Sequence, residues 1–212
     1  MLNLVKLPVR KSNVALRVCK GHFVTNHSHI NYYIDVTFQK SRLSEAQATA
    51  KAMVKQYVNT TIVDTILCLD GMEVVGTCLA EELTKEGFMS INAHQTIYVV
   101  TPETSSESQL FFRENLYPMI KGKHVLILMA SATTGITISR SMDCVRYYGG
   151  IVAGVSAIYS ARDTAEDGTP IHALFHVSDL PDYASYSAHN CPMCNRGEKI
   201  EALVTGGGYS TL

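Results

Sequence analysis

The sequence predicts an α/β protein built on a doubly wound parallel sheet, and three observations support that prediction. Short apolar runs alternate with amphipathic segments of helical length through most of the chain. Glycine or a small polar stretch separates these runs from the segments that follow them. The 212 residues are 46% hydrophobic and 17% charged, as in an ordinary globular domain. Strands that alternate with helices form a parallel sheet with helices on both faces.

The predicted elements lie between about residues 41 and 177. Ser44 can cap the first helix through its hydroxyl, Gly71 lies in the turn before the second, and Gly149 and Gly150 end the third. Short apolar runs predict strands, and apolar residues at three- and four-residue spacing predict helices. In chain order the elements are helix 44–59, strand 62–69, helix 72–86, strands 96–101 and 125–130, helix 137–148 and strand 151–159.

Three regions fall outside this alternation. Residues 1–40 form an N-terminal segment that contains three histidines and two adjacent tyrosines, ahead of the α/β core at 41–177. Residues 102–123 are long for a loop in such a core and predict a mobile lid or an excursion. Residues 178–212 form a C-terminal tail with a Cys-Pro-Met-Cys sequence and three consecutive glycines.

Charge and composition exclude several classes of protein. The 18 Lys and Arg against 19 Asp and Glu give a formal net charge of −1, which argues against direct nucleic-acid binding. No apolar run reaches the roughly 18 residues of a membrane helix, and no signal-peptide pattern is seen. We therefore expect a cytoplasmic protein without a membrane partner. Its six cysteines are then expected to be reduced thiols or metal ligands.

The most informative segment follows the predicted strand 125–130, where the apolar run breaks into small and hydroxyl residues before a helix. Backbone N–H groups at such a helix start, with threonine hydroxyls beside them, form an anion site suited to a phosphate monoester. A plain turn with a threonine cap is the alternative interpretation. The predicted phosphate-binding residues are Ala132, Thr133, Thr134, Gly135, Ile136 and Thr137.

This segment resembles the phosphoribosyl diphosphate (PRPP) loop of the type I phosphoribosyltransferases, and other segments resemble the orotate branch of that family in the same chain order. Residues 71–80 are similar to its diphosphate loop, residues 21–35 to its N-terminal base-binding hood, and 153–162 to the strand whose arginine holds the orotate carboxylate. The resemblance spans roughly residues 20 to 200. It implies a diphosphate loop formed by Asp70, Gly71, Met72 and Glu73. It also implies a base pocket formed by Phe23, Tyr32, Tyr33 and Arg162.

The departures from the family pattern concern its charged residues. Met129 and Ala130 occupy the two acidic positions whose carboxylates hold the ribose hydroxyls in the family. Val75 replaces a lysine of the diphosphate loop, and the lysine-rich mobile loop is not recognisable within 102–123. PRPP carries several negative charges, so these changes are expected to weaken both its binding and catalysis. No catalytic residue is assigned.

Two function classes are consistent with this pattern. The first is an orotate-type phosphoribosyltransferase, which transfers ribose 5-phosphate from PRPP, bound with Mg²⁺, to a pyrimidine-like acceptor. The second is a non-catalytic relative that binds a nucleotide or sugar phosphate and acts as a regulator. The resemblance also implies a homodimer. The missing acidic pair favours weak activity or none.

Cys191 and Cys194 stand at a spacing that can place two thiolates on one metal ion. A tetrahedral Zn²⁺ site needs two further ligands, for which His27 and His29 are the predicted residues and His22 and His189 the other candidates. A reduced thiol pair and a redox pair are the alternatives.

Overall fold

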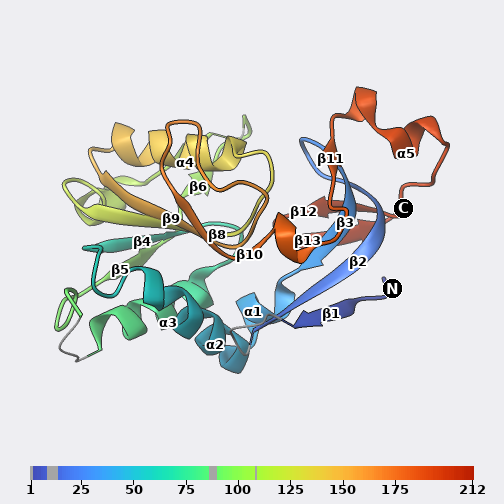
Figure 1. The fold of residues 1–212 in the computed structure, drawn as a ribbon. Helices are drawn as coiled ribbons and strands as arrows, with labels where there is room; N and C mark the ends of the chain where they lie inside the picture. Colours follow the sequence, from blue (N-terminus) through green and yellow to red (C-terminus); the bar gives the residue numbers. More distant parts are fainter. Residues whose placement is uncertain (1, 9–13, 86–89, 108) are drawn as a thin grey trace.

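The computed structural model describes residues 2–8, 14–85, 90–107 and 109–212, and they form two main sheets (Figure 1). The first sheet has five strands in the order β10-β9-β8-β4-β5, and every neighbouring pair is parallel. This confirms the predicted doubly wound α/β core. Its strands are β4 (Thr65–Cys68), β5 (Tyr98–Val100), β8 (His124–Ala132), β9 (Ile151–Ser160) and β10 (Ile171–His176).

Helices cover both faces of this sheet. In Figure 1, α2 (Leu43–Met53) and α3 (Glu73–Thr84) lie below it, and α4 (Ile136–Tyr147) lies above. The two hydrophobic clusters follow the same division, because Leu126 and Leu128 pack with α2 and α3 whereas Val125 and Ile127 pack with α4. Alternate residues of a buried strand thus serve opposite layers.

Most predicted boundaries differ from the observed ones by a few residues. The first helix ends at Met53 and continues as the short 3₁₀ helix Val54–Gln56. The second ends at Thr84, and its predicted end at Glu86 lies outside the described residues. Strand β10 was not predicted, because its half-buried polar and apolar residues do not form an apolar run.

The second sheet joins the N-terminal segment to the C-terminal tail. Its strand order is β11-β3-β2-β12-β13, and β1, off this order, pairs antiparallel with the first part of β2, at Ala15–Val18. Strands β2 and β12 run parallel over two residue pairs, Phe23 with Ala202 and Val24 with Leu203. The strands are β1 (Val5–Pro8), β2 (Ala15–Val24), β3 (His29–Asp35), β11 (Ser185–Tyr186), β12 (Ala202–Thr205) and β13 (Gly208–Thr211).

The described residues of 102–123, which are all of them except 108, form an excursion from the core. It contains the hairpin β6 (Glu103–Thr104) and β7 (Leu110–Phe111), followed by the 3₁₀ helix Glu114–Met119. Arg113 donates two hydrogen bonds of 2.7 Å to the carboxylate of Glu103, so its charge is paired within the excursion. None of the helices in the described ranges has the length and apolar character needed to cross a bilayer.

Two short α-helices lie outside the core layers. Helix α1 (Thr37–Ser41) follows β3 and leads into the core, and α5 (Pro192–Asn195) lies in the tail. Proline at the first position of α5 is compatible with a helix start, where no N–H partner is needed.

Candidate functional site

The first turn of α4, directly after the loop that follows β8, presents backbone N–H groups without an intrahelical acceptor. Gly135 caps α4 with φ of 86°, a left-handed conformation that glycine adopts without strain. The N–H of Ser139 donates to the carbonyl oxygen of Gly135 at 3.0 Å and closes the first helical turn. The N–H groups of Ile136, Thr137 and Ile138 therefore have no intrahelical acceptor. This geometry suits an anion.

A second loop lies beside it at the end of β4. The N–H of Met72 donates to the carbonyl oxygen of Leu69 at 3.1 Å, and φ is 56° at Asp70 and 76° at Gly71. These values describe a type I′ turn, which needs residues that tolerate positive φ. Burial raises the pKa of Asp70, although a hydrogen bond with the backbone of Ala130 and the charge of Lys40 act in the opposite direction.

Lys40 connects this turn to the C-terminal tail. Its Nζ donates to the carbonyl oxygen of Asp70 at 2.8 Å and to that of Gly206 at 2.6 Å. A Cβ at position 206 would lie 2.5 Å from Oδ1 of Asp70. Only glycine at this position therefore lets the tail come this close to the turn. Lys40 could not be singled out from the sequence, because a lone lysine at the end of a short helix carries no motif.

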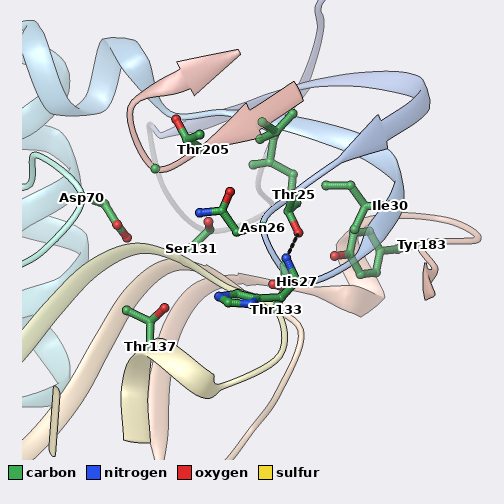
Figure 2. Close-up of a pocket in the computed structure, with 13 residues that line it drawn as sticks. Thr25, Asn26, His27, Ile30, Asp70, Ser131, Thr133, Thr137, Tyr183 and Thr205 are labelled. Atoms are coloured by element: carbon green, nitrogen blue, oxygen red, sulfur yellow. Dashed lines mark hydrogen bonds between the residues drawn. The ribbon is translucent and has the colours of Figure 1, made fainter. Parts of the chain in front are cut away.

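A cleft lies between the two loops and the second sheet (Figure 2). One part has a volume of about 200 Å³, and a neighbouring part of about 670 Å³ shares Asn26, His27, Asp70 and Thr137 with it. Arg140, one turn along α4, lines the larger part. Figure 2 shows the ring of His27 directed toward the loop between β8 and α4. The smaller part is also lined by Thr25, Ile30, Ile34, Ser131, Thr133, Tyr183, Val204, Thr205 and Gly206.

The core carries no carboxylate at the two positions that are acidic in the family. Met129 and Ala130 are each 2% exposed, and they pack on opposite faces of the sheet, Met129 toward α4 and Ala130 toward α2 and α3. Ser131 is the next residue and lines the cleft. Asp70, beside Ala130, is the carboxylate that the cleft does contain.

The remaining residues implied by the diphosphate loop are divided between the core and the surface. Met72 is fully buried, and Glu73 accepts a hydrogen bond of 3.0 Å from Oγ1 of Thr101. Val75, which stands where many family members have a lysine, is also fully buried. Its side chain contributes to packing on the α3 side of the sheet.

The implied base-pocket residues lie in two different places. Arg162 is exposed and donates from Nη1 to the carbonyl oxygen of Thr134 at 3.2 Å, which places it against the loop. Phe23, Tyr32 and Tyr33 are buried in the second sheet. None of these three aromatic residues lines the cleft. Phe23 and Tyr33 pack in the hydrophobic cluster of the second sheet, and Tyr32 packs in the core cluster that contains α2 and α3.

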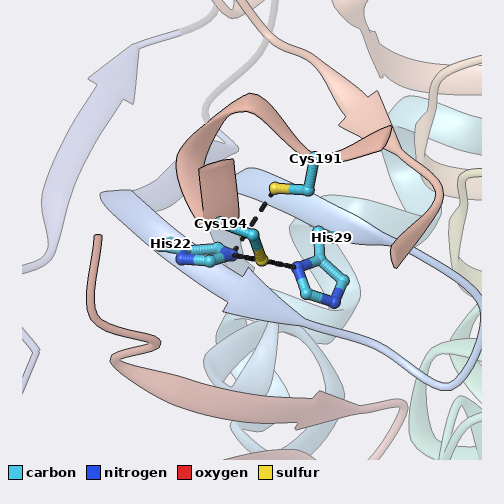
Figure 3. A group of neighbouring side chains, drawn as sticks. All are labelled: His22, His29, Cys191 and Cys194. Carbon is cyan, nitrogen blue, oxygen red and sulfur yellow. Dashed lines mark hydrogen bonds between the residues drawn. The ribbon is translucent and has the colours of Figure 1, made fainter. Parts of the chain in front are cut away.

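Four metal-ligating side chains meet where the tail crosses the β2–β3 hairpin (Figure 3). The ligand atoms of His22, His29, Cys191 and Cys194 all lie within 4.8 Å of one another, in a group that could hold a metal ion. His27, which was expected to be a ligand, lies instead in the cleft, because it belongs to the tip of the hairpin. His22 takes the place in the metal-ligating group that was expected for His27.

The comparisons with known proteins agree with the predicted resemblance. No protein-family model matches the chain. An orotate phosphoribosyltransferase from Caldanaerobacter subterraneus subsp. tengcongensis is 24% identical over 183 residues, which cover 84% of this chain and 85% of that protein.

Solved structures share the fold at low sequence identity. UMP synthase of Leishmania donovani matches with a TM-score of 0.56 and 17% identity over 77% of this chain, which spans only 34% of that protein. Orotate phosphoribosyltransferase from Aeropyrum pernix matches with a TM-score of 0.53 and 19% identity, and the match covers 76% of this chain and 88% of that protein. Orotate phosphoribosyltransferase from Mycobacterium tuberculosis H37Rv, solved in complex with PRPP, matches with a TM-score of 0.50 and 18% identity. The match covers 70% of this chain and 82% of that protein. This chain therefore has the type I phosphoribosyltransferase fold, and its sequence resembles the orotate phosphoribosyltransferases.

Proposed function

We propose that the cleft binds a phosphorylated ribose compound, either PRPP or a nucleotide, with the 5-phosphate on residues 132–137. The free N–H groups at the start of α4 and the left-handed Gly135 support this proposal. Thr133 and Thr137 add hydroxyls, and Arg140 adds a positive charge in the larger part of the cleft. A related protein of the same fold is solved with PRPP.

We further propose that transfer of the ribose 5-phosphate to orotate is very weak or does not occur. Departure of diphosphate leaves positive charge on the ribose ring, so a catalyst must hold the ribose and neutralise the diphosphate. The observation that carries this proposal is the burial of Met129 and Ala130, neither of which can bind a hydroxyl. The core position of Val75 and the pairing of Arg113 with Glu103 also reduce the positive charge available to diphosphate.

The same observation supports the second function class, a non-catalytic binding protein. The loop suited to phosphate is retained, whereas the positions that would act on the ribose carry core side chains. Such a protein would bind its ligand reversibly and report its concentration to a partner. Binding of PRPP or a nucleoside monophosphate without turnover is the outcome that favours this class.

Two cofactors belong to the proposal. The carboxylates of Asp70 and Glu73 are the oxygen ligands that this end of the sheet offers to Mg²⁺ bound with PRPP, since Mg²⁺ prefers carboxylates and phosphate oxygens. The group formed by His22, His29, Cys191 and Cys194 offers the nitrogen and sulfur ligands that Zn²⁺ prefers.

The resemblance also supports proposals about the state of the protein. We infer a homodimer with a pyrimidine-like acceptor near Arg162, in the cytoplasm, with no membrane or nucleic-acid partner. Sedimentation of the purified chain tests the oligomeric state, and a monomer at micromolar concentration would contradict it.

Replacing Gly135 with valine is expected to weaken binding of ribose 5-phosphate by at least about tenfold, because a Cβ there is strained and meets Arg162. Calorimetry measures the affinity. Gly168→Val is the matched control, because Gly168 has the same φ of 86° and a Cβ added there would meet no atom within 4 Å. Equal affinities in the two variants would remove the phosphate site from this loop.

In a steady-state assay with PRPP, Mg²⁺ and orotate, we expect a rate about 10⁴-fold or more below the roughly 10 s⁻¹ of a typical enzyme. Two or three lost interactions of about 2 to 3 kcal/mol each produce a deficit of this size. Quantifying orotidine monophosphate by chromatography measures the rate. Turnover near the typical value would show that other residues replace the acidic pair.

Asp70→Asn is expected to weaken binding of PRPP in the presence of Mg²⁺ by about tenfold, because it removes the carboxylate that lines the cleft. Ribose 5-phosphate measured without Mg²⁺ should bind as well as before. Asp182→Asn is the control, because Asp182 also has positive φ, at 62°, and is exposed. An unchanged PRPP affinity would exclude Asp70 from the ligand site.

A further inference from the structure

We propose that Zn²⁺ held by His22, His29, Cys191 and Cys194 clamps the C-terminal tail to the β2–β3 hairpin and thereby fixes two walls of the ligand cleft. The effect on ligand affinity rests on the proposed phosphate site, whereas the clamp itself does not. The metal would have a structural role and would not take part in chemistry at the cleft.

Three sulfur–nitrogen distances in the group match those of a tetrahedral site, and the two ligand nitrogens, Nε2 of His22 and Nδ1 of His29, lie 2.9 Å apart. Nε2 of His22 lies 3.7 Å from Sγ of Cys191 and 3.7 Å from Sγ of Cys194, and Nδ1 of His29 lies 3.3 Å from Sγ of Cys194. Zn–S bonds of about 2.3 Å and Zn–N bonds of about 2.0 Å place sulfur and nitrogen about 3.5 Å apart in a tetrahedron. Two sulfur and two nitrogen ligands favour Zn²⁺ over Mg²⁺ or Ca²⁺.

The ring of His22 is oriented for ligation. Its Nδ1 lies 2.9 Å from the backbone carbonyl oxygen of Glu198. A carbonyl oxygen only accepts, so Nδ1 carries the proton and Nε2 keeps its lone pair for the metal. A hydrogen bond from the second ring nitrogen to a backbone carbonyl is the usual support for a metal-bound histidine. The group is mostly enclosed: Cys191, His22 and His29 are buried, and Cys194 is exposed.

The hairpin tip lies between the two histidine ligands along the chain. Thr25 donates its N–H to the carbonyl oxygen of Ser28 at 2.8 Å, and its Oγ1 accepts from the N–H of Ser28 at 2.9 Å. These bonds make the tip compact. Asn26 and His27 in this tip line both parts of the cleft. A metal ion held by one histidine before the tip and one after it would therefore keep this wall of the cleft in place.

The second wall continues from the cysteine ligands. Beyond Cys194, the tail donates a hydrogen bond of 2.8 Å from the N–H of Glu201 to the carbonyl oxygen of His22. It then pairs with β2 as β12 and reaches Thr205 and Gly206, which line the cleft. The segment from 187 to 201 has only short helical turns, so it offers little regular structure to hold this wall without the ion.

The first test measures metal in the full chain purified without a metal-affinity tag. We expect about one Zn²⁺ per chain, lost in Cys194→Ser and retained in His189→Ala, a nearby exposed histidine outside the group. Replacement by Co²⁺ should give the absorption of a tetrahedral thiolate site. A chain that takes up neither ion, or one in which Cys191 and Cys194 form a disulfide as isolated, would overturn the proposal.

The second test compares zinc-loaded protein with protein treated with a chelator. Hydrogen exchange at residues 25–28 and 203–206 should accelerate at least about tenfold on metal removal and return on reloading, while β8 stays protected. Ribose 5-phosphate affinity should fall about tenfold in parallel. Cys194→His, which keeps a ligand, should behave more like the wild type than Cys194→Ser, and this comparison guards against simple misfolding.

The two proposals fail in different ways. If zinc-loaded protein binds no ribose 5-phosphate but exchange still depends on the metal, the proposed ligand is wrong and the clamp stands. If ribose 5-phosphate binds with the same affinity, and residues 25–28 exchange at the same rate, with and without zinc, the clamp is wrong and the phosphate site stands.

Discussion

The parallel pairing of β4 with β8 is the interaction on which the cleft depends. Leu67 lies opposite Ile127 and Cys68 opposite Leu128, and the N–H of Leu69 extends the ladder to the carbonyl oxygen of Leu128. Because the strands are parallel and in this register, the turn at Asp70 and the loop before α4 leave the sheet at the same edge. Burial of both strand faces makes this register costly to shift.

The elements of the core could be predicted because their signals are local. Apolar runs of strand length, apolar spacing of helical period and glycine at the turns all lie within about fifteen residues of one another. The second sheet could not be predicted in this way. It pairs residues 23 and 24 with 202 and 203, and only the folded chain brings them together. For the same reason, spacing alone could not choose between His22 and His27 as partners of the two tail cysteines.

The parts of the candidate site that carry a sequence motif could be predicted. The parts whose position depends on the packing of the folded chain could not. The loop at 132–137 and the turn at Asp70 followed from glycine and from the family resemblance, and they do lie side by side. Lys40 and Arg140 carried no such mark. Met129 and Ala130 now belong to two different layers of core packing. A carboxylate placed at either position would enter an apolar layer, so the family chemistry could not be restored there without repacking.

The irregularity in β2 also limits how the length of the chain can vary. The pairing of β2 with β3 shifts by one position between Lys20 and Phe23, so Gly21 and His22 together face a single residue of β3. Side chains on a strand alternate between its faces, and a bulge changes which face each one takes. Deleting one residue here would restore a regular ladder but turn either His22 or the hairpin tip to the opposite face. This short stretch of β2 should therefore resist insertions and deletions more strongly than single substitutions.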